Sequence, residues 1–262
     1  SAEYQTAGQL AADVKGEDGS TVTLTISRDG EAKDVAVVRG NVVVEHVETR
    51  MLDPLTGYLY VSDFSDNLPE QFEAGLMHLK EEGAQRIVFD MRGNPGGSAD
   101  SLIKCVDMLL PEGVIATIRG RRDGEVMKSV WKSEDGTLVP EDMPFAILVD
   151  GGTASAAELF SGCLRDYERA VLIGEKTYGK GSGMNTWPLS DGSAVTITTF
   201  NYFLPKGDLI EGKGLEPHIE AEAPPAEYRG IPQYELTPEQ DPGLRAALDY
   251  FSELGVTSAK AR

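Results

Sequence analysis

Short apolar runs and helical apolar patterns alternate through the middle of this chain. Four nearly continuous apolar runs are typical of strands buried on both faces, and they lie at 58–61, 86–91, 145–149 and 170–174. Three longer segments carry apolar side chains at helical spacing, at 68–82, 98–110 and 154–166. The alternation predicts an α/β fold in which helices cover a mainly parallel sheet.

Other segments predict hairpins and terminal elements. Residues 117–131 predict a hairpin with Arg122, Asp123 and Gly124 at its turn. Two further strands are predicted in 186–203, about a turn at 190–192. The elements expected toward the two ends are a helix at 3–15, strands at 21–27 and 35–44, and an amphipathic helix near 244–254.

These patterns divide the chain into three parts. Residues 1–45 form a helix-plus-two-strand segment that is too small to be a comfortable independent domain. Residues 46–225 contain the alternating α/β core. Residues 226–262 form a polar C-terminal segment that ends in the last helix.

The charge balance narrows the choice of partners. Among 262 residues, 24 Lys and Arg face 43 Asp and Glu, which gives a formal net charge of −19. Nucleic acids and anionic membranes bind clustered Lys and Arg, so we expect neither as a partner. No apolar run approaches the ~20 residues of a membrane helix. No signal peptide opens the sequence, which is compatible with its removal.

Cysteine and histidine usage gives no sign of a disulfide or a metal. Cys105 and Cys163 both fall in apolar helical patterns, which predicts buried free thiols. His46, His78 and His218 lack the spacing of a zinc site, so we expect structural roles for them. We predict no metal and no cofactor.

Three glycine-rich turns, each following a predicted strand, carry the candidate chemistry, and they lie at 90–97, 150–155 and 174–183. Loops at the carboxyl ends of parallel strands line the ligand crevice, so the first two turns should share one rim of the sheet. Ser155 would open the helix after the second turn, where unpaired N–H groups suit a developing oxyanion. The predicted donors are the N–H of Ala156 and that of Gly96 or Gly97.

A serine hydroxyl needs a base to take its proton before it can act as a nucleophile. A lysine can replace the usual histidine when burial leaves its amine neutral. Lys180, within Thr-Tyr-Gly-Lys-Gly at 177–181, is the predicted base. Each feature alone also has an ordinary interpretation, because Ser155 could be a helix cap and Lys180 a surface residue.

Together, the three turns resemble the C-terminal processing peptidases, also called tail-specific proteases. Asp-Met-Arg-Gly-Asn-Pro-Gly-Gly at 90–97 is similar to the family's Asp-Leu-Arg-x-Asn-Pro-Gly-Gly. Thr-Ala-Ser-Ala-Ala-Glu at 153–158 is similar to the motif of its nucleophile, and residues 177–181 to the motif of its general base. Several ordered motifs at matching spacing make this resemblance specific.

The resemblance runs from about Tyr58 to Ile219 and implies a fold, a mechanism and a setting. The implied fold is a crotonase-like (ClpP-like) core, with Ser155 as nucleophile and Lys180 as general base. The implied function is a serine endopeptidase that cleaves protein or peptide substrates near a free C-terminus. The implied setting is the bacterial cell envelope or an exported (periplasmic or extracellular) compartment. The C-terminal helix offers a surface for a homo-oligomer.

Two departures from the family pattern stand out. The family often has a glutamine four residues after the lysine, where it orients the base, but Met184 occupies this position. Asn185, the next residue, could orient the base only through a shifted loop. The family's core usually follows a PDZ domain, and residues 1–45 resemble only its second half, without the carboxylate-binding loop.

These departures leave two alternatives to an active peptidase. The first is a catalytically impaired relative that binds an extended peptide or another ligand, with Met184 marking the lost requirement. The second is an acyl-thioester enzyme of the crotonase-like fold, although fold analogy alone does not carry function. The sequence shows no basic patch for the phosphates of an acyl-CoA.

Overall fold

The computed structural model describes residues 7–122 and 125–255 of the chain. Asp123 and Gly124, predicted at a hairpin turn, lie outside the described residues, as does the start of the helix predicted at 3–15. The chain divides into two compact units, Ser1–Glu45 and His46–Arg262. The C-terminal segment after residue 225 therefore belongs to the same unit as the α/β core.

The smaller unit contains one helix and one hairpin. These elements are α1 (Ala7–Val14), β1 (Thr21–Arg28) and β2 (Glu31–Val38), and the two strands pair antiparallel. Strand β2 ends at Val38, so the prediction of a strand up to residue 44 was wrong there. The reason lies in the partner strand, because β1 begins at Thr21, which pairs with Val38. Arg39 then donates through its guanidinium to the carbonyl of Val14 at 2.7 Å and the hydroxyl of Ser20 at 2.9 Å.

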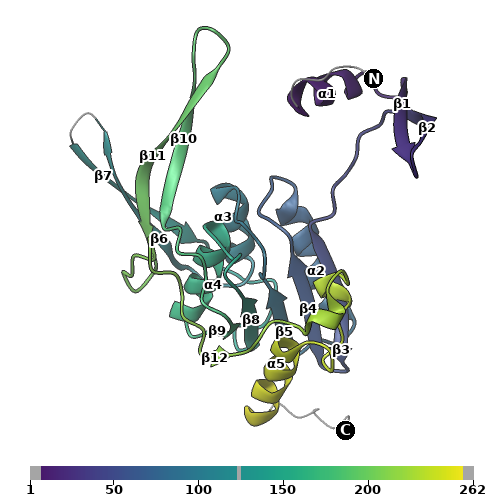
Figure 1. Cartoon of the computed structure of the whole chain (residues 1–262). Coiled ribbons are helices and arrows are strands. Elements are labelled where there is room, and N and C mark those ends of the chain that lie inside the picture. Colours follow the sequence, from purple (N-terminus) through teal and green to yellow (C-terminus); the bar gives the residue numbers. More distant parts are fainter. Residues whose placement is uncertain (1–6, 123–124, 256–262) are drawn as a thin grey trace. The chain divides into compact units, whose positions relative to one another are not determined.

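The larger unit is built on a six-stranded sheet (Figure 1). Its strands, in spatial order, are β12 (Ile219–Glu220), β9 (Ala170–Gly174), β8 (Phe145–Val149), β5 (Arg86–Asp90), β4 (Thr56–Val61) and β3 (Val47–Asp53). All neighbours pair in parallel except β3 and β4. The four predicted buried strands are confirmed. Strand β3 was missed, because charged residues interrupt its apolar pattern.

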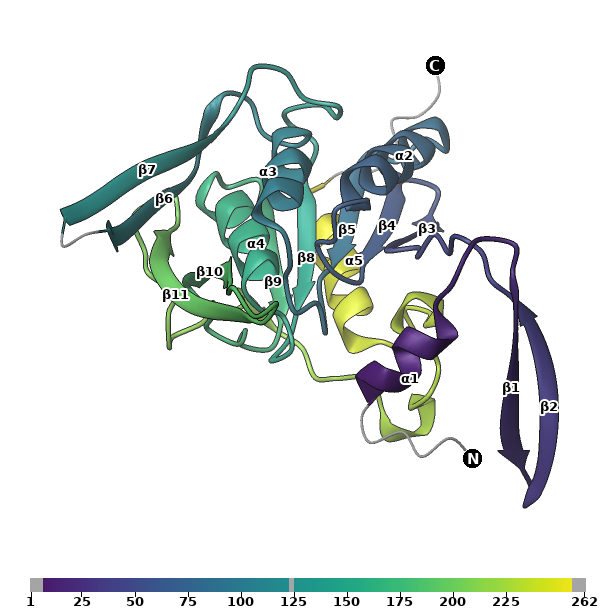
Figure 2. The same cartoon turned by 90° about the horizontal axis from the view of Figure 1, so that it is seen from above.

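Helices cover both faces of this sheet (Figures 1 and 2). Three of them pack on one face, namely α2 (Leu68–Glu81), α3 (Ala99–Asp107) and α4 (Ala156–Asp166). Helix α5 (Pro242–Glu253) packs on the other face through Leu244, Ala247 and Phe251. The predicted α/β core with a mainly parallel sheet is thus confirmed. Among the described residues, no helix is both long and apolar enough to cross a membrane.

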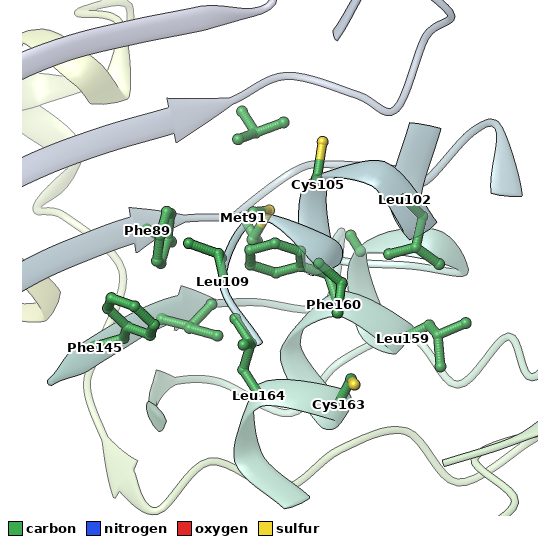
Figure 3. Packing of buried hydrophobic residues seen from close by; sticks show 14 of the residues in the cluster. Phe89, Met91, Leu102, Cys105, Leu109, Phe145, Leu159, Phe160, Cys163 and Leu164 are labelled. Atoms are coloured by element: carbon green, nitrogen blue, oxygen red, sulfur yellow. The ribbon is translucent and has the colours of Figure 1, made fainter. Parts of the chain in front are cut away.

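The apolar layer beneath α2, α3 and α4 consists mainly of aliphatic side chains, with phenylalanine rings packed among them (Figure 3). The ring of Phe89 on β5 meets Phe160 of α4 edge-on at 5.5 Å between centroids, and Phe145 of β8 at 5.2 Å. Cys105 and Cys163 are buried free thiols, as predicted. Burial raises the pKa of both thiols, so they are inert at neutral pH.

A second, four-stranded antiparallel sheet adjoins the core. Its order is β10 (Ser182–Pro188), β11 (Ala194–Phe203), β6 (Gly113–Arg122) and β7 (Glu125–Ser133). Both predicted hairpins are present. Their union into one sheet, through pairing of 200–203 with 117–120, was not predicted. This union brings the Tyr202 end of β11 beside the carboxyl end of the parallel sheet.

A buried group of charged side chains joins the N-terminus of α5 to the end of β5. The Arg92 guanidinium contacts Asp90 at 2.6 Å and Asp241, the N-cap of α5, at 2.7 Å, and all three side chains are almost fully buried. The Tyr58 hydroxyl donates to Asp90 at 2.7 Å. Burial alone would lower the pKa of Arg92, but its two carboxylate partners raise it well above the usual value. The arginine therefore stays charged in the core.

We predict that Asp241→Ala lowers the free energy of unfolding by about 3–5 kcal/mol, because it leaves a buried guanidinium with one partner fewer. Asp241→Asn, which keeps an N-cap oxygen, should lose less. Urea denaturation followed by circular dichroism measures both variants. Equal midpoints for Asp241→Ala and the wild type would contradict this role.

Candidate active site

The three glycine-rich turns are held together by hydrogen bonds. The Asp150 carboxylate accepts the N–H groups of Gly93 and Gly152, each at 2.9 Å. The Thr153 hydroxyl donates to the Met91 carbonyl at 2.8 Å, and the Thr153 carbonyl accepts from the Tyr178 N–H at 3.0 Å. Each of the three turns is thus bonded to another one at the carboxyl ends of β5, β8 and β9.

Ser155 has an unusual backbone conformation at the start of α4. Its φ is 57° and its ψ is −117°, a region that L-residues rarely adopt and that costs on the order of 1–3 kcal/mol. Such strain persists only where the surroundings hold it in place. Ala154, which precedes Ser155, is tied by its N–H to the Asn94 carbonyl at 2.9 Å.

The buried carboxylate of Glu158, one turn into α4, links the serine loop to the lysine loop. Glu158 is fully buried. One oxygen accepts the backbone N–H groups of Ser155 at 2.9 Å and Lys180 at 2.8 Å. The other accepts the Thr177 hydroxyl at 2.5 Å and the Gly179 N–H at 2.7 Å. The two loops therefore cannot move apart without leaving a buried carboxylate unsatisfied.

One cavity of about 320 Å³ brings the predicted nucleophile and base together. Ser155 and Lys180 both line it, and so do Ala156 and Gly97. The predicted site residues from three separate turns thus meet at a single concave surface, beside the N-terminus of α4.

The structure distinguishes the two glycines predicted as oxyanion donors. The N–H of Gly96 already donates to the Asn94 side chain at 2.9 Å, and Gly96 is buried. Gly97 is exposed and lines the cavity. Ala156, the first residue of α4, also lines the cavity. Gly96 instead allows close packing, because a Cβ there would lie 2.8 Å from the Ser155 Cβ.

Met184 and Asn185 both follow a bulge in β10, but they line different cavities. The register of β10 against β11 shifts between Gly183 and Met184. Met184 lines the cavity of Ser155 and is half exposed. The Asn185 amide donates to the Thr199 hydroxyl at 2.9 Å, and Asn185 lines a different cavity.

Tyr202 is a cavity residue that the sequence did not indicate. Its side chain is buried, and its hydroxyl donates to the backbone carbonyl of Lys180. Burial, and then the nearby Glu158 carboxylate, raises the pKa of Tyr202, so the hydroxyl remains a donor at neutral pH. Glu158 was visible only as part of the nucleophile motif. Tyr202 had no signal, because it lies on a distant hairpin.

The site offers no ligand set for a metal. Among the described residues, no group of three or more His, Cys, Asp and Glu side chains could hold a metal ion. The chemical groups at the cavity are a hydroxyl, a primary amine and backbone N–H donors. This combination is suited to nucleophilic acyl transfer.

Comparison with known sequences finds one family and close relatives. The profile of peptidase family S41 matches residues 55–221. A probable CtpA-like serine protease of Staphylococcus haemolyticus is 33% identical over 218 residues, which is 83% of this chain but 43% of that protein. A protein with the same description in Staphylococcus aureus is 32% identical over 216 residues. The chain thus spans less than half the length of these relatives.

Solved structures share the fold. The photosystem II D1 C-terminal processing protease superposes with a TM-score of 0.61 at 26% identity, over 79% of this chain and 57% of that one. A putative S41 protease from Bacteroides fragilis gives a TM-score of 0.59 at 21% identity, over 89% and 66% of the two chains. The second likeness, at its lower identity, shows the fold alone.

We predict that Gly96→Ala destabilises the chain far more than Gly93→Ala. Both glycines have positive φ, but a Cβ at Gly96 would lie 2.8 Å from the Ala154 carbonyl oxygen, whereas one at Gly93 meets open space. The expected losses are about 3 kcal/mol or more for Gly96→Ala and about 1 kcal/mol for Gly93→Ala. Urea denaturation compares them, and equal losses would contradict the close packing described.

Proposed function

This chain belongs to peptidase family S41, and from that premise we propose that it is a serine endopeptidase with Ser155 as nucleophile and Lys180 as general base. The membership confirms the resemblance noted in the sequence. The observation that carries the proposal is that Ser155 and Lys180 line one cavity of about 320 Å³. The backbone N–H groups of both residues also donate to the same oxygen of Glu158.

Acylation would use both side chains. Lys180, as the neutral amine, takes the proton from the Ser155 hydroxyl while the serine oxygen attacks the substrate carbonyl. The resulting oxyanion accepts the N–H groups of Ala156 and Gly97, which line the cavity next to the serine. Gly96 supports this arrangement by packing against Ser155, since its own N–H is taken by Asn94.

Deacylation would reuse the same groups. The Lys180 ammonium gives its proton to the leaving amine, and the C-terminal part of the substrate departs. Lys180 then takes a proton from the water that attacks the acyl-enzyme, and it returns this proton to the Ser155 oxygen as the acyl group leaves as a carboxylic acid. The backbone of Lys180 is fixed from two sides, by Glu158 at its N–H and by Tyr202 at its carbonyl. We therefore propose that these two residues orient the base, in place of the glutamine that is Met184 here.

We also propose a substrate class, a domain assignment and a location for this chain. The substrate is a protein or peptide with a free C-terminus, in line with the C-terminal processing for which the D1 protease is named. Residues 1–45 correspond to the second half of a PDZ domain. The core is ClpP-like, and the protein works in the cell envelope or outside the cell. A homo-oligomer is compatible with the fold.

A binding protein without catalysis is the second candidate, and Met184 in the cavity favours it. A phosphonate that reacts with activated serines separates the two. The peptidase should be labelled at Ser155, as shown by mass spectrometry of the intact chain. A binding relative should remain unlabelled.

We predict that Ser155→Ala and Lys180→Met each reduce cleavage of casein by about 10³-fold or more, because each removes one half of the acyl-transfer pair. Lys180→Met keeps the length of the side chain without the amine. Lys206→Met, at an exposed lysine away from the cavity, is the matched control and should cleave normally. Full activity of Lys180→Met would rule out the proposed base.

We also predict that Glu158→Gln lowers kcat by about 10–100-fold with little change in KM, because misplacement of reacting groups acts mainly on the chemical step. In Glu158→Gln the side-chain NH₂ group, itself a donor, would replace one carboxylate oxygen and would face the N–H or O–H donors that this oxygen accepts in the wild type. Glu216→Gln, at an exposed carboxylate, is the matched control. Steady-state kinetics with a peptide substrate measures both, and an unchanged kcat for Glu158→Gln would refute its positioning role.

A further inference from the structure

A second cavity lies between the two hairpins of the four-stranded sheet. Strands β6 and β11 pair only over 117–120 and 200–203, and Figures 1 and 2 show the hairpins separating beyond this point. At the branch, a Cβ on Gly120 would lie 2.6 Å from the Thr199 carbonyl oxygen, so only a glycine lets the strands meet so closely. We call the cavity, of about 660 Å³, the hairpin notch.

The hairpin notch continues from the cavity of Ser155. Trp131 and Phe200 line both cavities, and their rings meet edge-on at 6.3 Å between centroids. Met184 lines the Ser155 side, and its neighbour Asn185 lines the notch. A peptide held at Ser155 could therefore extend over these two rings into the notch without a turn of the chain.

The notch combines apolar surface with positive charge. Met127 and Trp187 line it and are 52% and 44% exposed. Arg121 of β6 and Lys128 of β7 also line it. Lys128 pairs with Arg119, two residues from Arg121, so both cationic side chains leave one face of this hairpin, whereas Met127, which pairs with Gly120, leaves the other. Among the described residues, none of those lining the notch is acidic, in a protein of net charge −19.

We propose that the hairpin notch is a substrate subsite that binds an unfolded segment carrying apolar side chains and Asp or Glu side chains. The inference rests on the proposed peptidase function. The aromatic rings and Met127 remove apolar side chains from water, and Arg121 and Lys128 attract carboxylates. The acidic remainder of the protein would repel such a segment, so these cations also steer it to the site.

Side-chain carboxylates suit the notch better than a terminal carboxylate. A terminal carboxylate is usually captured by a nest of backbone N–H groups in a closed pocket. The notch instead presents two long cationic side chains on exposed strands, which can reach carboxylates at several positions along an extended chain. A second copy of this protein, docking an acidic surface, is the competing occupant and is an outcome of the test.

The first experiment uses matched peptides that differ only in Glu or Gln on one side of the scissile bond. The wild type should cleave the Glu peptide with a KM about 10-fold lower, and this preference should fade at high salt. Arg121→Gln with Lys128→Gln should raise the KM of the Glu peptide to that of the Gln peptide, with kcat unchanged. Lys206→Gln with Arg229→Gln, at exposed cations outside both cavities, is the control.

The second experiment measures occupancy without turnover. The chain has two tryptophans: Trp187 lines the notch and Trp131 lines both the notch and the Ser155 cavity, so intrinsic fluorescence reports on this continuous surface. Titration of the Ser155→Ala variant with the Glu peptide should change the emission, and the same peptide amidated at its C-terminus should bind equally. When Arg121→Gln and Lys128→Gln are introduced into the Ser155→Ala variant, this binding should weaken about 10-fold.

The outcomes separate the two proposals. Cleavage of Glu and Gln peptides with equal KM by the wild type, or an unchanged KM in the double variant, overturns the subsite while leaving the peptidase intact. An emission change that requires a free C-terminus, or that follows self-association in sedimentation, also overturns it. Binding to the Ser155→Ala variant without any cleavage by the wild type would refute the peptidase function but support the notch.

Discussion

The carboxylate of Glu158 is the interaction on which the site depends. It lies in the first turn of α4, fully buried, and receives four hydrogen bonds, one from Ser155 and three from the loop at 177–180. A buried charge is tolerated only when its hydrogen-bonding capacity is met, so the carboxylate couples the geometry of both loops. The strained backbone of Ser155 and the backbone of Lys180 are thus coupled through one group, and Tyr202 adds a second contact at the Lys180 carbonyl.

Much of the core could be predicted because its signals are local. Strands buried on both faces appear as apolar runs, and β5 and β8 are buried at every residue. The glycine-rich turns were visible because a close approach of backbone, as at Gly96, excludes any side chain. Ser155 and Lys180 were indicated by such turns and by the resemblance to the family motifs, and the rule that loops at the carboxyl ends of parallel strands meet predicted a shared rim for the first two turns.

Features that depend on long-range pairing could not be predicted in this way. The two hairpins were evident, but nothing local in residues 117–120 or 200–203 indicates that they pair with each other. Tyr202 reaches the cavity only through this pairing. The same holds for the contact of Arg92 with Asp241, which lie 149 residues apart. The choice between Gly96 and Gly97 needed the hydrogen bond of Asn94, which the motif alone does not reveal.

The place of α5 has a consequence for biosynthesis. Among the described residues this helix is the last regular element, and its side chains pack on Tyr58, Val88 and Leu148 on one face of the parallel sheet. While the chain emerges from the ribosome, that face stays bare until Asp241 and the helix after it have been translated. A nascent chain therefore exposes the apolar side chains of this face in the interval between translation of β9 and translation of α5.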